Sequence, residues 1–259
     1  MRESKENQEN YIFDYEKDIS IEEKDNIIKE INKQYKRAKK INTTDSWEDF
    51  ATNAMFAKVL FPKESNLDFT HQDYKAINTL SKKFLNEDRF YKHLNIATAQ
   101  KILFPTQWRL RNKDFHSDEV IWQKLVKNLI EKVPFQTWGD FYSFFYCAQN
   151  MKILAPKRFA NFKLQKALKN TLWYEEIKNE LEFNKNEHYT NFTILATPLH
   201  LLEFPSKIQI EEDEWKEMEE QAQQLKNDDI LVFSEFSSRR KILSAKDISI
   251  TEESFDLIF

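Results

Sequence analysis

The histidines and the clustered acidic residues of this sequence have side chains that could bind a metal ion or transfer a proton. No histidine stands at the His-Glu-x-x-His spacing that places two metal ligands on one face of a helix. The acidic run at positions 211–214 lacks the Asx-Gly pattern of a calcium loop, and is better explained as the solvated first turn of a helix. We therefore predict neither a metal site nor a cofactor. The histidines considered are His71, His93, His116, His188 and His200.

A single glycine, Gly139, limits the catalytic motifs that the chain can contain. Phosphate-binding loops, dinucleotide fingerprints and the nucleophile elbow each require several glycines at fixed spacing. No serine, threonine or cysteine stands in a local nucleophile motif, whereas a triad assembled from distant residues would leave no such trace. The only cysteine, Cys147, is interpreted as a small buried side chain. We therefore predict that the protein is not an enzyme.

Charge is distributed unevenly along the chain. Positions 101–170 hold 13 Lys and Arg against 5 Asp and Glu, whereas positions 171–233 hold 5 against 15. In the basic block, tryptophans stand among the cationic side chains, a combination that suits phosphate contact and base stacking, an acidic protein partner, or the acidic block of the chain itself. We therefore treat this block as a candidate partner-binding surface. Its candidate residues are Trp108, Arg109, Arg111, Lys113, Lys157, Arg158 and Lys163.

A sequence motif of sixteen residues that ends in proline recurs along the chain. It occupies positions 47–62, 90–105 and 141–156, and in a weaker form 190–205. A fifth copy ends in Lys-Ile-Leu-Ser-Ala at 241–245, with alanine in place of proline. The ends of successive copies lie 43, 51, 49 and 40 residues apart. Self-similarity at such intervals predicts a stack of helix pairs.

A second sequence motif precedes the first helix of each pair, whereas the motif that ends in proline closes the second helix. It has two alternating apolar residues followed by acidic ones, as at 19–25, 67–74, 208–215 and 248–255. The apolar residues are expected to form a short extended anchor, and Thr70 and Thr251 to cap the helices that follow. We expect the first helices of the pairs near 22–40, 70–85, 117–132, 161–182 and 211–226. We expect the second helices near 46–61, 89–104, 137–155, 189–204 and 229–243, and Pro198 should kink or restart the fourth of these.

The recurring positions have structural explanations. Trp47, Phe141 and Phe144 mark a helical face that we expect in the core. Small residues recur eight positions before each copy's end and would allow close helix approach; they are Ala54, Ala97 and Ala148. Lysines recur in the last turns, where the helix dipole favours a cation by ~0.3–1 kcal/mol. These are Lys58, Lys101, Lys152 and Lys241.

The expected ends of the helices carry residues that stop an α-helix. The prolines at positions 62, 105, 156 and 205 prevent the second helices from continuing. Asparagine replaces glycine best in the left-handed conformation that closes a helix. It stands at the expected ends of three first helices, at Asn86, Asn184 and Asn227.

These patterns predict an all-α protein, an α-solenoid of about four to five helix-pair repeats of 40–51 residues. It resembles HEAT and TPR arrays in kind, although the chain lacks the Trp-x-x-Leu-Gly-x-x-Tyr phrase of tetratricopeptides. A polar arm at 1–18 is expected to precede a single helical-repeat domain at 19–259. Its repeats are placed at 19–62, 67–105, 114–156, 161–205 and 208–245, with a truncated repeat at 246–259.

Solenoids present long concave surfaces to partners, so the favoured function is that of a protein–protein interaction scaffold or adaptor. The alternative is an RNA-binding repeat protein that uses the basic block at 101–170. No apolar run approaches the ~18 residues of a membrane span, and the first residues do not form a signal peptide. A cytoplasmic protein without membrane association is therefore expected, and the sequence indicates no oligomeric state.

Overall fold

The structure is a computed structural model that describes residues 19–111, 118–131, 135, 137–160, 179–183, 189–202, 210 and 212–244. Within these residues there are twelve helices, one of them a 3-10 helix, and no strand. The predicted all-α class is confirmed. The predicted arm at 1–18, most of the helix predicted at 161–182 and the segment 246–259 lie outside the described residues.

The long helices begin and end within three residues of the predicted positions. The first helices of the pairs are α2 (Ile21–Ile41), α4 (His71–Asn86), α8 (Glu119–Ile130) and α14 (Glu212–Asp228). The second helices are α3 (Thr44–Leu60), α5 (Phe90–Leu103), α9 (Trp138–Leu154), α13 (Tyr189–Leu201) and α15 (Ile230–Ser244). Three short helices, η1 (Ser65–Leu67), α6 (Pro105–Arg111) and α10 (Pro156–Ala160), follow α3, α5 and α9.

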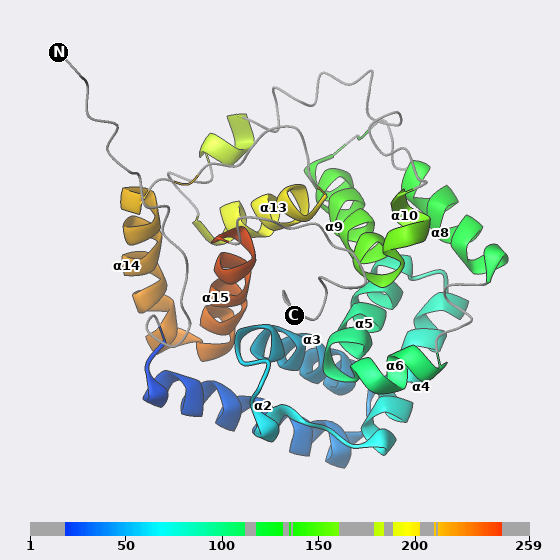
Figure 1. The fold of residues 1–259 in the computed structure, drawn as a ribbon, viewed down its shortest axis with the longest axis horizontal. Coiled ribbons are helices and arrows are strands. Elements are labelled where there is room, and N and C mark those ends of the chain that lie inside the picture. The colour runs from blue at the N-terminus through cyan, green and yellow to red at the C-terminus, as the bar shows by residue number, and fades with distance from the viewer. Residues whose placement is uncertain are drawn as a thin grey trace.

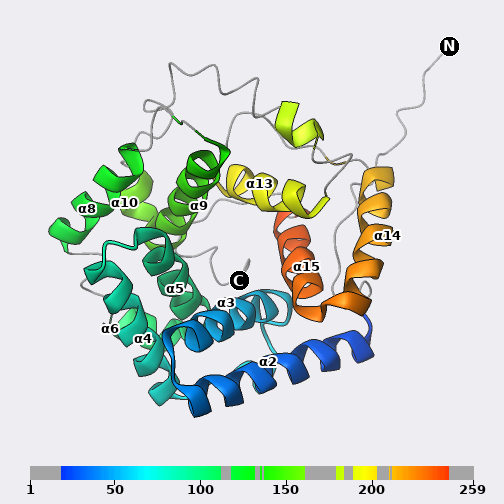
Figure 2. The ribbon, with the colours of Figure 1, turned by 180° about the vertical axis from the view of Figure 1, so that it is seen from behind.

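The second helices form a closed ring (Figure 1). Helix α3 packs on α5, α5 on α9, α9 on α13 and α13 on α15, and α15 packs back on α3. We call α3, α5, α9, α13 and α15 the inner helices. Helices α2, α4, α8 and α14 lie outside them in both views (Figures 1 and 2). The expected open solenoid is therefore not shown, because the first and last helix pairs of the described chain meet.

Several contacts join the last helix pair to the first. The amine of Lys226 in α14 forms an ion pair with Glu23 in α2. The hydroxyl of Ser238 in α15 donates a hydrogen bond to the Phe56 carbonyl of α3 at 2.7 Å. Helix α15 also packs against α2. Sequence periodicity indicates which helices pair locally, but it does not specify the rotation from one pair to the next. The closure was therefore missed.

The inner and outer helices differ in how much of their surface is buried. Helix α5 buries an unbroken run of residues from His93 to Leu103, because it has neighbours on several sides. Helix α14 has a polar exposed face rich in acidic residues and buries only a narrow apolar stripe that includes Trp215, Met218 and Ala222. A helix with one buried stripe and a charged opposite face suits the outside of a bundle.

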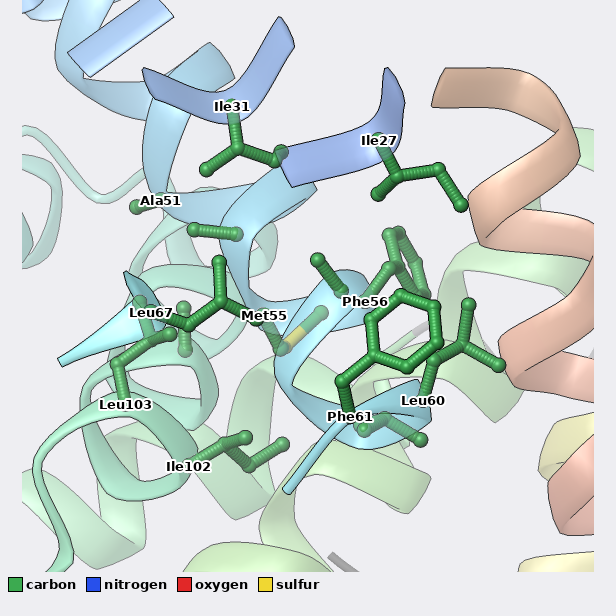
Figure 3. Packing of buried hydrophobic residues seen from close by; sticks show 14 of the residues in the cluster. Ile27, Ile31, Ala51, Met55, Phe56, Leu60, Phe61, Leu67, Ile102 and Leu103 are labelled. Atoms are coloured by element: carbon green, nitrogen blue, oxygen red, sulfur yellow. The ribbon is translucent and has the colours of Figure 1, made fainter. Parts of the chain in front are cut away.

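The core of the described residues consists of two apolar clusters, each shared by several helices. In Figure 3, Ile27 and Ile31 point from α2 toward α3, which presents Ala51 and Met55. A second apolar cluster joins α5, α8, α9 and α13. Trp47, Phe141 and Phe144 are all buried, as predicted, and so are Cys147 and Ala148.

Threonine and serine caps fix the starts of several helices. Thr70 forms the predicted cap of α4, in a reciprocal capping box with Asp73. Thr251 lies outside the described residues. The predicted Ile-x-Ile anchor is wrong for Ile21, which is the first residue of α2 and is 81% exposed. Ser20 caps α2 directly before it, so that only Ile19 packs inward.

The prediction of left-handed asparagines at helix ends was also wrong where it can be checked. The left-handed residues are Asn42, which follows α2, and Asp88, with φ angles of 53° and 55°. Asn86 is the last residue of α4, and Asn227 lies inside α14. Asn184 is outside the described residues. Local side-chain type alone did not identify which position after the helix takes the left-handed conformation.

Helices α3, α5 and α9 end shortly before Pro62, Pro105 and Pro156, as predicted, and two of these prolines also start new helices; Pro205 lies outside the described residues. Helices α5 and α9 end at Leu103 and Leu154, and Pro105 and Pro156 are the first residues of α6 and α10. Proline suits the first helical position because the amide hydrogen that it lacks has no intrahelical acceptor there. Pro198 does not restart a helix, because α13 continues through it.

Candidate binding cavity at the centre of the ring

A cavity of about 680 Å³ that is open to solvent is lined by all five inner helices. Its size falls within the range of about 300–1,000 Å³ that is usual for ligand sites in proteins. Because no single helix or neighbouring pair encloses it, the cavity exists only when the ring is closed.

Each inner helix lines the cavity with two residues four positions apart. This spacing places both side chains on one face of an α-helix, one turn apart. The pairs are Thr52 and Phe56 on α3, Tyr91 and Asn95 on α5, Tyr142 and Tyr146 on α9, Asn191 and Leu195 on α13, and Glu235 and Arg239 on α15.

The recurring lysines link the C-terminal ends of the inner helices. The Lys101 amine donates a hydrogen bond to the Ile153 carbonyl of α9 at 2.6 Å, and Lys152 donates to the Leu201 carbonyl of α13 at 2.8 Å. Lys241 closes the ring by the same contact, since its amine lies 2.5 Å from the Val59 carbonyl of α3. The sequence predicted only that each lysine would interact with the dipole of its own helix. In the structure these three lysines also donate to a carbonyl of a neighbouring helix. We call the end of the ring formed by these last turns the lysine rim.

Lys58 is the exception among the recurring lysines. Its amine forms an ion pair with Asp68 at 2.7 Å and does not reach the next inner helix.

The contact that closes the ring also affects protonation. Burial lowers the pKa of Lys241 from its ordinary value of 10.5 to about 8.

The opposite end of the cavity lies at the first turns of the inner helices. Tyr91, Gly139 and Asn191 all lie within the first three residues of their helices and line the cavity. We call this end the open rim. Tyr91 is 45% exposed there.

A short hydrogen-bonded network joins three of the inner helices inside the cavity. The Tyr146 hydroxyl donates to Asn95 Oδ1 at 2.7 Å, and Asn95 Nδ2 donates to Thr52 Oγ1 at 3.0 Å. The rings of Tyr91 and Tyr146 are 4.9 Å apart and tilted by 31°. Burial raises the pKa of both tyrosines, so their hydroxyls are protonated at neutral pH.

An ion pair on α15 forms the opposite wall. Arg239 donates to Glu235 Oε1 through Nε at 3.1 Å and through Nη2 at 2.7 Å. Its guanidinium also lies over the Phe56 ring, 5.2 Å from the ring centre. The arginine is therefore held in one orientation by a carboxylate at one edge and an aromatic ring at one face.

Several polar groups of the cavity have no hydrogen-bond partner among the described residues. They are the hydroxyls of Tyr91 and Ser143, the side-chain amide of Asn191 and Nη1 of Arg239. Pro198 adds a further polar group, because it has no amide hydrogen for the Ile194 carbonyl one turn earlier in α13. These groups suit hydrogen bonding to a ligand.

The arrangement is suited to binding. Its tyrosines are neutral, and its carboxylate is already engaged by Arg239. No cluster of three or more His, Cys, Asp or Glu side chains within the described residues could hold a metal ion. Of the histidines, His93 is buried outside the cavity, with Nδ1 2.9 Å from the Ser81 carbonyl, and burial lowers its pKa.

Of the residues proposed from the basic block, the described side chains of Trp108, Lys157 and Arg158 do not line this cavity. Trp108 is only 4% exposed and packs in the second apolar cluster, so its ring is not presented for stacking. Lys157 is exposed on α10. Arg109 and Arg111 belong to α6, but their side chains are outside the described part of the chain, as are Lys113 and Lys163.

Arg158 is engaged within the chain. It forms an ion pair with Glu119 of α8, and its guanidinium lies 4.8 Å from the ring centre of Trp122. Trp122 is itself buried. The described residues do not bring the proposed basic set into one surface, and partner binding by that block stays a prediction.

Sequence reasoning missed the cavity residues because it followed the positions that recur. When the copies are aligned on their ends, Thr52, Asn95, Tyr146 and Glu235 occupy the same position, ten residues before the end. That position lies between the recurring aromatic and the recurring small residue, yet its residue type differs in every copy. The sequence signal that could have indicated the cavity was a helical face whose residues vary between otherwise similar copies.

No protein-family model matches the chain, and no curated protein or solved structure shows significant similarity to it. None of the described helices is long and apolar enough to cross a membrane.

Proposed function

We propose that this protein is a non-enzymatic interaction protein that binds a segment of a protein partner in the central cavity. The observation that carries the proposal is the convergence of one face of each inner helix on an open cavity with unpartnered polar groups. Each helix presents a different pair of side chains, so the cavity wall is chemically varied.

The side chains of the cavity are of the kinds that dominate binding between proteins. Tyrosine and arginine are enriched among the residues that contribute most to interface affinity. Tyr91 offers an exposed ring with a free hydroxyl, and Arg239 is held rigidly by Glu235. Rigid groups lose little conformational entropy on binding, which favours affinity.

The open rim favours a chain segment as the occupant. The cavity is open to solvent beside the half-exposed Tyr91, so a bound side chain can stay connected to a larger molecule outside.

A cavity-filling substitution tests the proposal. Ser143→Trp places an indole ring among the cavity residues, and Thr79→Trp places the same ring on the exposed face of outer helix α4 as the control. A displayed peptide library is selected on the parent protein, and the enriched peptides are titrated against both variants. We expect Ser143→Trp to weaken binding at least about tenfold and Thr79→Trp to leave it unchanged. Equal binding by the parent and Ser143→Trp would contradict the proposal.

A further inference from the structure

We infer that the bound segment carries a carboxylate next to an aromatic side chain, with the carboxylate on Arg239 and the aromatic ring against Tyr91. The inference rests on the proposed function and specifies the chemistry of the partner. It concerns the central cavity and not the basic block.

Arg239 presents a fixed donor edge to the cavity. Its side chain is 5% exposed, and Nε and Nη2 both donate to Glu235 Oε1. Nη1 has no hydrogen-bond partner among the described residues, so two of its N–H groups remain for an acceptor from outside. A buried guanidinium with an unused edge is suited to a carboxylate, because charge-assisted hydrogen bonds are the strongest of their kind.

At the two cavity tyrosines the charge of Arg239 has a larger effect on the pKa than that of Glu235, although Cys147 and Glu48 act on Tyr91 in the same direction as Glu235. Burial is the largest influence on the pKa of Tyr91 and raises it, and the positive charge of Arg239 lowers it more than the negative charge of Glu235 raises it. The pKa of Tyr146 shows the same order of the two charges. Near these hydroxyls the guanidinium therefore outweighs the carboxylate.

The open rim adds further donors. Gly139 lines the cavity in the first turn of α9, where the first backbone amides have no acceptor within the helix. Among the described residues, Thr137 accepts from the amides of Asp140 and Phe141, and no acceptor is described for the amide of Gly139. The hydroxyl of Ser143, one turn further along α9, lines the same cavity. An acceptor on the ligand thus meets donors on both sides.

The aromatic part of the ligand follows from Tyr91. One part of its ring faces Tyr146 at 4.9 Å, and the residue is still 45% exposed. Phe56 and Phe145 line the cavity as well. An aromatic side chain would gain contact with these rings in the offset or edge-on arrangements that such pairs prefer.

Two matched peptides test the inference. Acetyl-Gly-Glu-Tyr-Gly-amide and acetyl-Gly-Gln-Tyr-Gly-amide differ only in the carboxylate, and their binding to the full chain is measured by NMR titration. We expect the Glu peptide to bind the parent at least about tenfold more tightly than the Gln peptide. Arg239→Gln should remove this difference, whereas Arg37→Gln, at an exposed position on α2, should keep it.

Further variants separate charge from folding. Glu235→Gln removes the competing carboxylate and should tighten binding of the Glu peptide several-fold. The double variant Arg239→Gln with Glu235→Gln avoids an unpaired buried charge, and it should bind both peptides equally if Arg239 alone makes the distinction. Thermal unfolding of each variant confirms that it is folded before the titration.

The outcomes distinguish the inference from the proposed function. If the parent binds both peptides equally, or binds neither, the inference is overturned. If library-selected peptides then still lose affinity in Ser143→Trp, the cavity binds partners by other chemistry and the proposed function stands. If neither the selected peptides nor the Glu peptide responds to Ser143→Trp, both proposals fail.

Discussion

The two ends of the inner helices are built from different kinds of residue. At the lysine rim, Lys101, Lys152 and Lys241 each satisfy a carbonyl of the next inner helix. At the open rim and along the cavity, Tyr91 and Ser143 have hydroxyls with no hydrogen-bond partner among the described residues. Unmade hydrogen bonds are costly in a buried site, and groups that remain accessible retain the capacity to bind. The lysine rim therefore holds the ring together, and the open rim is left for a ligand.

The comparison also separates recurring from variable positions. The lysine recurs because a backbone carbonyl in the last turn of the neighbouring helix has no hydrogen-bond donor within its own helix and needs a donor from outside. The cavity position occupied by Thr52, Asn95, Tyr146 and Glu235 does not recur, because each of these residues contributes a different group to one shared site. Stability and binding should consequently respond to different substitutions.

Lys101→Met should have the largest effect on stability. The substitution keeps an apolar stem of similar length but removes the donor to the buried Ile153 carbonyl. An unsatisfied buried acceptor costs ~1–3 kcal/mol, and we expect the free energy of unfolding to fall by that amount in a urea titration. Lys58→Met is the matched control, since Lys58 pairs with the exposed Asp68 and its amine lies at 3.4 Å from the Glu64 carbonyl, a longer contact than that of Lys101. An ion pair with one solvent-exposed partner contributes only ~0–1 kcal/mol. Equal losses in the two variants would remove the distinction drawn at the lysine rim.

Ala148→Leu compares core and cavity within one helix. Ala148 is fully buried in α9, which packs against α5, and the extra carbons should overpack the contact by ~1–3 kcal/mol. Ser143→Leu places the same side chain one and a half turns earlier, in the open cavity. We expect it to change the melting temperature little and to weaken peptide binding. If Ser143→Leu is the more destabilising variant, the cavity side of α9 is part of the core.

The pH dependence of stability should show that the Lys241 amine is buried at the contact that closes the ring. Its pKa is lowered to about 8 in the folded protein, against an ordinary value of 10.5. Between these two values the unfolded chain binds more protons than the folded one, so stability rises with pH over that window. Relative to Lys241→Met, the parent should gain more than ~1 kcal/mol between pH 8 and 10.5, because one pKa unit corresponds to about 1.4 kcal/mol. Parallel stability curves for the two proteins would contradict the assignment.

The helices and much of the core could be predicted from the sequence, because both depend on local patterns. Recurring aromatics at helical spacing placed Phe141 and Phe144 in the core, and prolines after Leu103 and Leu154 marked helix ends. These signals come from residues that are close in the chain. The closure of the ring depends on contacts such as Ser238 with Phe56, which are 182 positions apart and have no local trace.

The cavity could not be predicted for the same reason. Its wall is assembled from one face of each inner helix, and those faces meet only after the ring has closed. The charge blocks directed attention to residues such as Trp108 and Arg158 instead. Trp108 serves the core, and Arg158 is engaged by Glu119 and Trp122. Charge density along a sequence does not distinguish a partner surface from pairs formed inside the molecule.

Among these substitutions, Gly139→Ala should have the smallest effect on stability. It should nevertheless separate the stability of the ring from its affinity for a ligand. Gly139 is the only glycine of the chain, and it stands in the first turn of α9 without a positive φ. A Cβ there would meet only the Thr137 hydroxyl, at an ordinary contact distance of 3.5 Å.

The fold therefore does not require glycine at this position, and alanine should stabilise the protein by ~0.4–1 kcal/mol by restricting the unfolded chain. The added methyl group narrows the open rim beside an unpartnered hydroxyl, that of Ser143. We expect affinity for the selected peptides to fall by about twofold to tenfold while the melting temperature rises. Urea titration and peptide titration of the same preparation measure both quantities. A variant that gains stability and keeps full affinity would show that the ligand does not reach the first turn of α9, and would move the binding site toward Tyr146 and Arg239.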